Sequence, residues 1–325
     1  MTLYPNAVPT IDLSRWFDGS DREGVAREVD AALRRVGFLV VTGHGVDPAE
    51  RAAARPAARA FFALPPEAKR RYAVSVAGRG WLPPGVEANA YADPYADAAP
   101  AAATDLKESY SVGADGVTAP LDGYWFQENV WPQEVPALEA AVSAYLATMK
   151  RLADELLRIC AAALGVEDDF FTRHTAASTH TLNLNWYPPM ALTGPPQEGQ
   201  FRIGPHTDFG TVTVLDREAG RGGLQVWTPD AGWADAPFVE NAFTINTGDL
   251  LARWTGDRWL SNRHRVLPPQ ADAPDEDLVS LVYFYEADRD TVVEALGPPI
   301  GEPHDYAPVV ASEFLRERLD AITVP

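Results

Sequence analysis

His206 and Asp208 are the two residues of this chain whose types and spacing point most directly to chemistry. They lie in the segment Arg-Ile-Gly-Pro-His-Thr-Asp-Phe-Gly-Thr-Val-Thr-Val-Leu, residues 202 to 215. In an extended segment, side chains two residues apart leave on the same face, so this imidazole and this carboxylate can bind one cation from one side. The spacing therefore predicts two ligands of a metal site.

The third ligand is expected to be an imidazole from a distant strand, and the best candidate is His264, in Trp-Leu-Ser-Asn-Arg-His-Arg-Val-Leu. Two histidines and one carboxylate on one face of an octahedral ion leave the other face open, which suits ferrous iron and oxygen activation. A bare His-x-Asp is a weak signal, because such a pair in an arbitrary strand is more often a surface pair or a structural histidine. Two segments between the ligand candidates strengthen the prediction, residues 222 to 227 (Gly-Gly-Leu-Gln-Val-Trp) and 243 to 251 (Phe-Thr-Ile-Asn-Thr-Gly-Asp-Leu-Leu).

These segments resemble the iron and 2-oxoglutarate dependent oxygenases of the isopenicillin N synthase type. The resemblance extends to residues 8 to 14 (Val-Pro-Thr-Ile-Asp-Leu-Ser) and 37 to 46 (Gly-Phe-Leu-Val-Val-Thr-Gly-His-Gly-Val), so it covers most of the chain. It implies an enzyme that uses Fe(II), O2 and the co-substrate 2-oxoglutarate to hydroxylate, desaturate or cyclise a small-molecule substrate. In that family 2-oxoglutarate is split to succinate and carbon dioxide.

The resemblance also assigns roles to single residues. It implies that His206, Asp208 and His264 are both the metal ligands and the catalytic centre, and that Asn185 and Tyr187, in Asn-Trp-Tyr-Pro-Pro, contact 2-oxoglutarate. For Asn185 a purely structural role at the end of a strand is an equally good interpretation. Relatives that halogenate their substrates carry a small residue in place of Asp208, so halogenation is not expected here.

One position departs from the family pattern. Relatives carry Arg-x-Ser on a late strand, and that arginine pairs with the far carboxylate of 2-oxoglutarate, whereas this chain has Leu278-Val279-Ser280. The family serine is kept as Ser280, and period two places Leu278 on the same face. A buried carboxylate without a partner is strongly unfavourable, so either another cation substitutes or 2-oxoglutarate does not bind in the usual way.

Arg202 is the first substitute to consider, because an extended strand gives it the same parity as His206 and Asp208. The alternative is an arginine exposed at a strand end. Arg263 and Arg265 flank His264 and so have the opposite parity, which makes them worse candidates.

Three functions are consistent with these residues. The first is a 2-oxoglutarate dependent oxygenase, which the motifs favour. The second is an Fe(II) oxidase of the same fold that draws its electrons from the substrate without 2-oxoglutarate, and Leu278 is its main support. The third is a metal-bearing binding protein without turnover, which no feature of the sequence favours.

Composition limits the partners. The net charge is -19, from 46 acidic and 27 basic residues, which disfavours nucleic acid and anionic membranes because no basic cluster would neutralise phosphates. Cys160 is the single cysteine, so neither a disulfide framework nor a thiolate metal site is expected. The sequence shows no apolar run of signal or membrane length, which predicts a cytoplasmic protein. It does not predict an oligomeric state.

The pattern of elements predicts an α+β fold. Asp21 and Asp47 are helix caps, and apolar residues at intervals of three and four predict one long supporting helix from Pro136 to Leu164, ended by Gly165. After that helix, short segments with period two predict an antiparallel double-stranded β-helix, or jelly-roll barrel. We therefore expect one oxygenase domain over residues 1 to 325, with a mixed α/β N-terminal region in 1 to 125 and the jelly-roll catalytic core in 170 to 300.

Three smaller predictions follow from local sequence. The segment from Ala77 to Thr104 is rich in glycine and proline and carries Trp81, Tyr91 and Tyr95, which fits a loop that closes over a small molecule and fits a mobile surface loop equally well. His44, in Gly-His-Gly, is expected to bind backbone groups in a turn. Residues 311 to 322 are expected to form a helix on the outside of the barrel.

Overall fold

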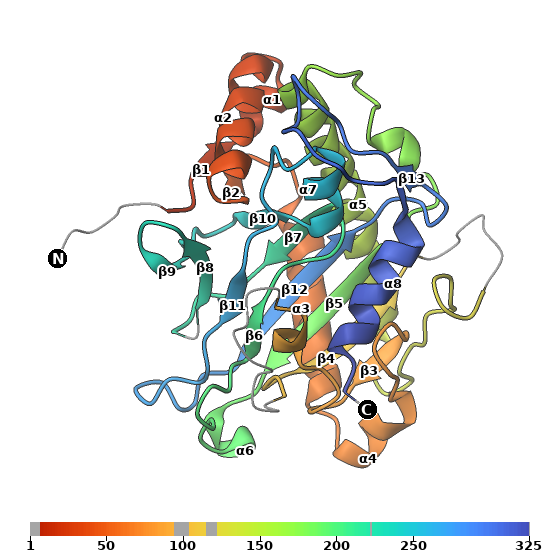
Figure 1. The fold of residues 1–325 in the computed structure, drawn as a ribbon. Helices are drawn as coiled ribbons and strands as arrows, with labels where there is room; N and C mark the ends of the chain where they lie inside the picture. The colour runs from red at the N-terminus through yellow and green to blue at the C-terminus, as the bar shows by residue number, and fades with distance from the viewer. Residues whose placement is uncertain (1–6, 94–103, 115–121, 222, 325) are drawn as a thin grey trace.

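The computed structural model of the chain describes residues 7–93, 104–114, 122–221 and 223–324. Its largest element is a sheet of eight strands, in which only β1 and β2 pair in parallel among the pairs described (Figure 1). In spatial order the strands are β1 (Thr10–Asp12), β2 (Phe38–Thr42), β10 (Phe243–Thr247), β7 (Val212–Asp216), β12 (Leu278–Tyr285), β5 (Thr181–Tyr187), β4 (Glu108–Gly113) and β3 (Gly80–Leu82).

A smaller sheet of four antiparallel strands completes the barrel. Its order is β6 (Ile203–His206), β11 (His264–Val266), β8 (Leu224–Thr228) and β9 (Gly232–Asp235). Strands of both sheets line one cavity, so the cavity lies between them. This arrangement confirms the predicted α+β fold with a jelly-roll core.

Three helices support the outer face of the large sheet (Figure 1). The longest is α5 (Ala137–Leu164), which ends at Gly165 in a left-handed conformation with φ 69°. It packs against α2 (Arg22–Arg35) and α3 (Pro48–Phe62), and together they bury the main hydrophobic core. The remaining elements are short and connect or flank these parts, namely α1 (Ser14–Phe17), α4 (Pro66–Lys69), η1 (Arg70–Tyr72), η2 (Asn89–Ala92), η3 (Thr172–His174), α6 (Met190–Thr193), α7 (Asp249–Trp254), β13 (Val292–Val293) and β14 (Val309–Val310).

Local capping follows the sequence closely. The Asp21 side chain accepts a hydrogen bond from the Gly24 amide, and the Asp47 side chain accepts one from the Ala49 amide. These bonds satisfy amides that the first turn of each helix leaves without an intrahelical partner. His44 also behaves as predicted, because its ring lies 2.8 Å from the Asn241 carbonyl and accepts a bond from the Val46 amide.

The described part of the segment from Ala77 to Thr104 contains a strand and a short helix that the sequence did not predict. Trp81 lies in β3, is 5% exposed and donates a hydrogen bond to Glu108, so it is a core residue of the sheet edge rather than a closing aromatic. The sequence missed β3 because glycine and proline on both sides of this short strand favour turns. Tyr91 is exposed in η2, and Tyr95 belongs to residues 94–103, outside the described part. Closure over a ligand therefore stays a prediction for this segment.

The predicted C-terminal helix is α8 (Ala311–Ile322). It contacts η2, and Leu315, Leu319 and Ile322 reach the wall of the cavity between the sheets. The helix is therefore part of the cavity and does more than cover the barrel. Among the described helices, none combines the length and the apolar character needed to span a membrane.

Candidate active site

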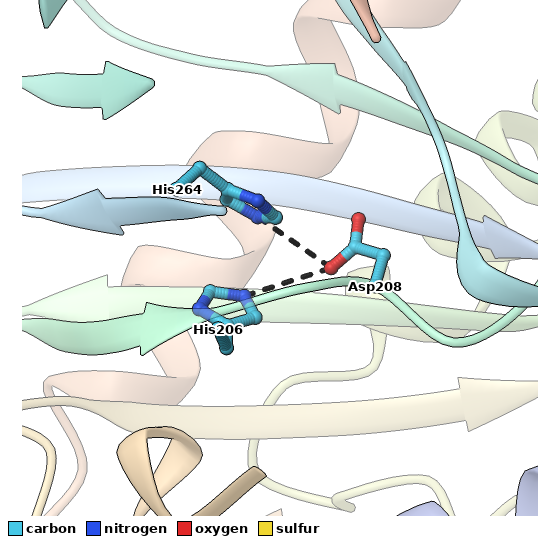
Figure 2. A group of neighbouring side chains, drawn as sticks. All are labelled: His206, Asp208 and His264. Carbon is cyan, nitrogen blue, oxygen red and sulfur yellow. Dashed lines mark ion pairs between the residues drawn. The ribbon is translucent and has the colours of Figure 1, made fainter. Parts of the chain in front are cut away.

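His206, Asp208 and His264 meet at the inner face of the small sheet. Figure 2 shows both imidazoles turned toward the same carboxylate oxygen, Asp208 Oδ1, which lies 3.6 Å from Nε2 of His206 and 3.5 Å from Nε2 of His264. His264 on β11 is directly opposite His206 on β6 in the strand register. The three ligand atoms lie within 4.8 Å of one another, and all three residues are buried.

The two histidines are oriented for metal binding by backbone carbonyls. Nδ1 of His206 lies 2.8 Å from the Gly204 carbonyl, and Nδ1 of His264 lies 3.1 Å from the Asn262 carbonyl. A carbonyl can only accept, so each Nδ1 carries the proton and donates it. Each Nε2 then presents its lone pair toward Asp208, as a ligating histidine requires.

Asp208 is held by two hydrogen bonds on its other oxygen. Thr213 Oγ1 donates to Oδ2 at 2.6 Å, and Asn246 Nδ2 donates to it at 2.7 Å. Burial alone would raise the pKa of Asp208, but the facing His264 and His206 and the bond from Asn246 outweigh it and hold the pKa well below the usual range. Asp208 therefore stays ionised, and Oδ1 remains available to a cation.

The backbone around Asp208 is fixed by a close approach of two segments. The Asp249 amide donates to the Asp208 carbonyl at 2.8 Å, and the Leu250 amide donates to the Phe209 carbonyl at 3.0 Å. A side chain at Gly248 would meet the Gly210 carbonyl oxygen at 2.5 Å, so only glycine allows this packing. The Thr-Gly-Asp sequence at 247 to 249 thus positions the carboxylate ligand.

The three residues shift one another's pKa values. Burial and the neighbouring His206 lower the pKa of His264 to about 4. Burial also acts to lower the pKa of His206, but the hydrogen bond and charge of Asp208 outweigh it and raise that pKa. A buried anion facing two imidazoles is unfavourable in isolation, and a bound metal ion would satisfy all three groups at once. Two nitrogens and one oxygen on one face are the donor set that suits ferrous iron.

Residues expected to contact 2-oxoglutarate lie beside the triad on one inward face. Asn185 and Tyr187 are the last inward residues of β5, and Ser280 lies directly opposite Asn185 on β12. All three are buried, and Asn185 and Tyr187 line the same cavity as the metal triad. Oδ1 of Asn185 accepts a hydrogen bond of 2.8 Å from Ser109, so its amide is held by β4.

Arg202 is buried rather than exposed, with 1% of its surface accessible. Its Nη1 donates to Glu276 at 2.6 Å, and its guanidinium lies over the ring of Tyr187 at 5.7 Å from the ring centre. Leu278 lies opposite Tyr187 on β12, at the position of the family arginine. Arg263 pairs with Asp93, and Arg265 binds Gln225, so both arginines are directed elsewhere, as their parity predicts.

The other end of the cavity holds polar atoms without partners. Four buried side-chain atoms in its wall have no hydrogen-bond partner within the described part of the chain, namely Arg79 Nε, Thr179 Oγ1, Asn183 Oδ1 and Glu286 Oε2. Asn183 precedes Asn185 by two positions on β5 and faces the same way. The cavity thus has one end beside Asn185 and Tyr187, which are expected to contact 2-oxoglutarate, and a second polar end near Glu286.

The sequence did not single out these four residues, nor Thr213 and Asn246. Asn183 and Asn246 were visible in the sequence as polar residues in strands with alternating polarity. Polar residues at inward positions of a barrel are candidate site residues, and this pattern could have identified them. Glu286 follows β12 by one residue and has the same parity as the inward Val282 and Phe284, so period two was the available signal there as well.

Family comparisons agree with this geometry. Residues 174–287 match the model of the 2OG-Fe(II) oxygenase superfamily, and residues 8–134 match the model described as non-haem dioxygenase in morphine synthesis N-terminal. A validamycin A dioxygenase from Streptomyces hygroscopicus subsp. limoneus is 41% identical over 98% of this chain and 87% of its own length. The chain belongs to the 2OG-Fe(II) oxygenase superfamily.

Solved structures of this superfamily share the fold over nearly the whole chain. A full-length Neurospora crassa protein in complex with alpha-KG and thymine superposes with a TM-score of 0.83, at 27% identity, covering 99% of this chain and 98% of that one. A 2OG-Fe(II) oxygenase family protein from Caulobacter crescentus has a TM-score of 0.80 and 31% identity, over 97% of this chain and 98% of its own. The protein is therefore an Fe(II) and 2-oxoglutarate dependent dioxygenase that oxidises a small molecule, the first of the three functions considered.

Proposed function

We propose that this dioxygenase oxidises a compact, polar small molecule that carries several hydroxyl or amino groups. The observation that carries the proposal is the set of four unpartnered polar atoms at the end of the cavity near Glu286, among the residues that the structure describes. Buried polar groups are normally hydrogen-bonded, so an unpartnered set that lines a cavity indicates a ligand that supplies the partners. The validamycin A dioxygenase named above supports a substrate resembling validamycin A.

Each of the four groups has a defined role in binding. Arg79 Nε–H can only donate, Asn183 Oδ1 can only accept, and Thr179 can do both. Burial, together with the charge of Asp208, raises the pKa of Glu286 well above its usual value, which favours the protonated carboxyl that can donate. Donors and acceptors that alternate around one cavity fit a hydroxylated molecule better than an apolar one.

The metal is assigned to His206, Asp208 and His264, and the co-substrate to Asn185, Tyr187 and Ser280. Iron and 2-oxoglutarate supply the oxidising chemistry when they are bound. The protein orients them, since Thr213 and Asn246 fix Asp208, while apolar side chains at Val282 and Phe284 limit water between the two ends of the cavity. Arg202 remains one candidate partner for the far carboxylate of 2-oxoglutarate.

We also propose that the chain works as one oxygenase domain. Residues of the N-terminal region, the barrel strands and α8 all contribute to the same cavity wall, which supports a single functional unit. Cytoplasmic location and the absence of a nucleic-acid partner remain predictions from composition.

Succinate formation with a panel of small molecules tests the substrate class. Purified enzyme with iron, oxygen and 2-oxoglutarate is incubated with validamycin A, sugars and amino sugars, and in parallel with thymine and apolar carboxylic acids. We expect substrate-dependent succinate and a mass gain or loss only in the first group. Asn183→Ala should raise KM for the substrate about tenfold and leave 2-oxoglutarate affinity unchanged. Turnover confined to apolar acids would refute the proposed class.

A further inference from the structure

A second cavity of about 200 Å³ lies beside the co-substrate residues. Tyr187, Leu278 and Ser280 line it, together with Arg217. It shares Tyr187, Leu215, Leu224 and Val266 with the cavity over the metal triad, so these side chains form a wall common to the two spaces. A ligand anchored at the metal therefore lies next to this second space.

Arg217 faces this space because of its position after β7. In the pairing of β7 with β12, Leu215 lies opposite Val282 and Asp216 opposite Leu281. The same register continued by one residue places Arg217 opposite Ser280. Thr213 and Leu215 both line the metal cavity, and period two gives Arg217 the same inward parity.

The charge of Arg217 is not neutralised by a carboxylate among the described residues. Its Nη2 donates to the carbonyls of Ala236 and Pro237, and its guanidinium lies 5.9 Å from the ring centre of Phe238. Burial lowers the pKa of Arg217 to about 10, and no acidic group acts against this effect. The arginine still carries a full positive charge at neutral pH.

Two carboxylates also line this cavity, but each is directed to another partner. Glu218 pairs with Arg59 at 2.5 Å and accepts from the Val279 amide. Asp235 accepts a hydrogen bond of 2.9 Å from Gln225. Neither forms an ion pair with Arg217 in the described structure, so its guanidinium is available to an anionic ligand.

Other cations near the co-substrate residues are already paired. The charge of Arg202 is paired with Glu276 through Nη1, although its Nε and Nη2 have no hydrogen-bond partner among the described residues. Lys107 binds Glu87 and also donates to Ser109 at 2.9 Å. Arg221 lines the second cavity but is exposed, so water screens its charge. Arg217 is thus the partly buried cation that combines an unneutralised charge with a position next to Ser280 and Tyr187.

We infer that Arg217 binds the far carboxylate of 2-oxoglutarate, in place of the arginine that Leu278 has displaced. In the family pattern the arginine lies on β12, whereas in this chain the positive charge lies at the end of the neighbouring strand β7. Ser280 and Tyr187 match the family positions and supply the hydroxyls. A guanidinium can donate two parallel hydrogen bonds to a planar carboxylate, which increases the affinity and fixes the orientation of the ligand. This inference rests on the use of 2-oxoglutarate by the superfamily.

Anaerobic titration tests it without any turnover. The Fe(II) enzyme is titrated with 2-oxoglutarate, and binding is followed by the visible charge-transfer absorption of the complex. Arg217→Met should raise the Kd for 2-oxoglutarate at least about 30-fold, since a buried charge pair loses one partner. Fe(II) affinity and the melting temperature report whether that variant is still folded and loaded.

Three further measurements make the result specific. The matched control Arg221→Met, in the same cavity, should change the Kd less than about twofold because its charge is exposed. A 2-oxo acid of equal length that lacks the far carboxylate, 2-oxopentanoate, should bind the wild type and Arg217→Met equally. Leu278→Arg added to Arg217→Met should restore most of the affinity for 2-oxoglutarate.

Several outcomes would overturn the inference. Unchanged 2-oxoglutarate affinity in folded, iron-loaded Arg217→Met would do so directly. A large loss in Arg202→Met without a loss in Arg217→Met would assign the role to Arg202 instead. Failure of the wild type to bind 2-oxoglutarate would contradict both this inference and the use of 2-oxoglutarate, whereas normal binding by both proteins would contradict only the role of Arg217.

Discussion

Asn246 donates a hydrogen bond of 2.7 Å to Oδ2 of Asp208, across 38 residues of sequence. The bond leaves Oδ1, which faces both histidines, as the oxygen available to a metal. Thr213 makes the second bond to Oδ2, from the strand that pairs with β10. Two neighbouring strands of the large sheet therefore orient the carboxylate of Asp208, which follows β6 of the small sheet by two residues.

Removal of this bond should weaken metal binding without removing a ligand. We expect Asn246→Ala to lower Fe(II) affinity about 10- to 100-fold, because partners that orient a metal ligand typically contribute that much. Anaerobic titration with Fe(II) and a competing chelator measures it. Asn183→Ala is the matched control, since Asn183 lines the same cavity without touching Asp208. Equal affinities for the two variants would show that Asn246 does not tune the site.

Asp216 anchors the outer face of β7 and is fully buried. It accepts hydrogen bonds from Arg51 at 2.7 and 2.8 Å and from Arg55 at 2.7 Å, and Tyr145 lies 3.3 Å away. Asp216→Ala should lower the free energy of unfolding by about 3 to 5 kcal/mol, because two half-buried guanidinium groups lose their fully buried anion. Urea unfolding measures the change.

Arg27→Ala is the control for that experiment. Arg27 pairs with Glu23 at 3.5 Å on the exposed face of α2, and such surface pairs contribute less than about 1 kcal/mol. If both variants lost the same free energy, the network around Asp216 would not be a stabilising feature of β7.

Glu286 should make stability depend on pH in the metal-free protein. Its pKa is raised in the folded state. Once the pH exceeds the ordinary pKa of glutamate, the unfolded chain therefore releases a proton that the folded chain retains. The associated stability is present at low pH and is lost as pH rises through the folded pKa. Glutamine at position 286 does not titrate. The free energy of unfolding of Glu286→Gln should therefore increase relative to that of the wild type as pH rises from about 5 to 8.

Urea unfolding of the metal-free proteins at several pH values measures this difference. Glu317→Gln, at an exposed position of α8, is the control and should follow the wild type throughout. Parallel profiles for wild type and Glu286→Gln would contradict a protonated, buried carboxyl in the cavity.

Leu319 of α8 lines the cavity and should affect substrate more than co-substrate. We expect Leu319→Ala to raise KM for the substrate several-fold, because part of the cavity wall is removed, while the Kd for 2-oxoglutarate stays within about twofold. Steady-state kinetics and the anaerobic titration give the two values. Leu192→Ala, at an exposed site in α6, is the control. A change of 2-oxoglutarate affinity without a change of KM would place α8 at the wrong end of the cavity.

The proximity of the three proposed metal ligands could be predicted from sequence, because two of them are close in sequence and the third lies in a recognisable family motif. His206 and Asp208 are two residues apart, and His264 lies in a segment typical of the family. Asn246 and Thr213 were not predictable as partners of Asp208, because their contact depends on which strands pair and in what register.

Arg217 illustrates a signal that period two could have supplied. Its parity with Thr213 and Leu215 is visible in the sequence, but its proximity to Ser280 follows only from the pairing of β7 with β12. Trp81 is a case in which local sequence misled the prediction. The glycine and proline residues around it indicated a loop, whereas it lies in β3 at the edge of the large sheet. The local sequence pattern thus predicted many of the helices and strands and the direction of their side chains. Which side chains come into contact depends on the order in which the strands pair.

Iron content is the most direct test of the central claim that His206, Asp208 and His264 hold the metal. Atomic absorption after reconstitution with Fe(II) and desalting should give about one iron per chain in the wild type. His206→Ala, Asp208→Ala and His264→Ala should each lose most of the iron and, with 2-oxoglutarate added, the charge-transfer absorption. Full iron content in all three folded variants would contradict the assignment.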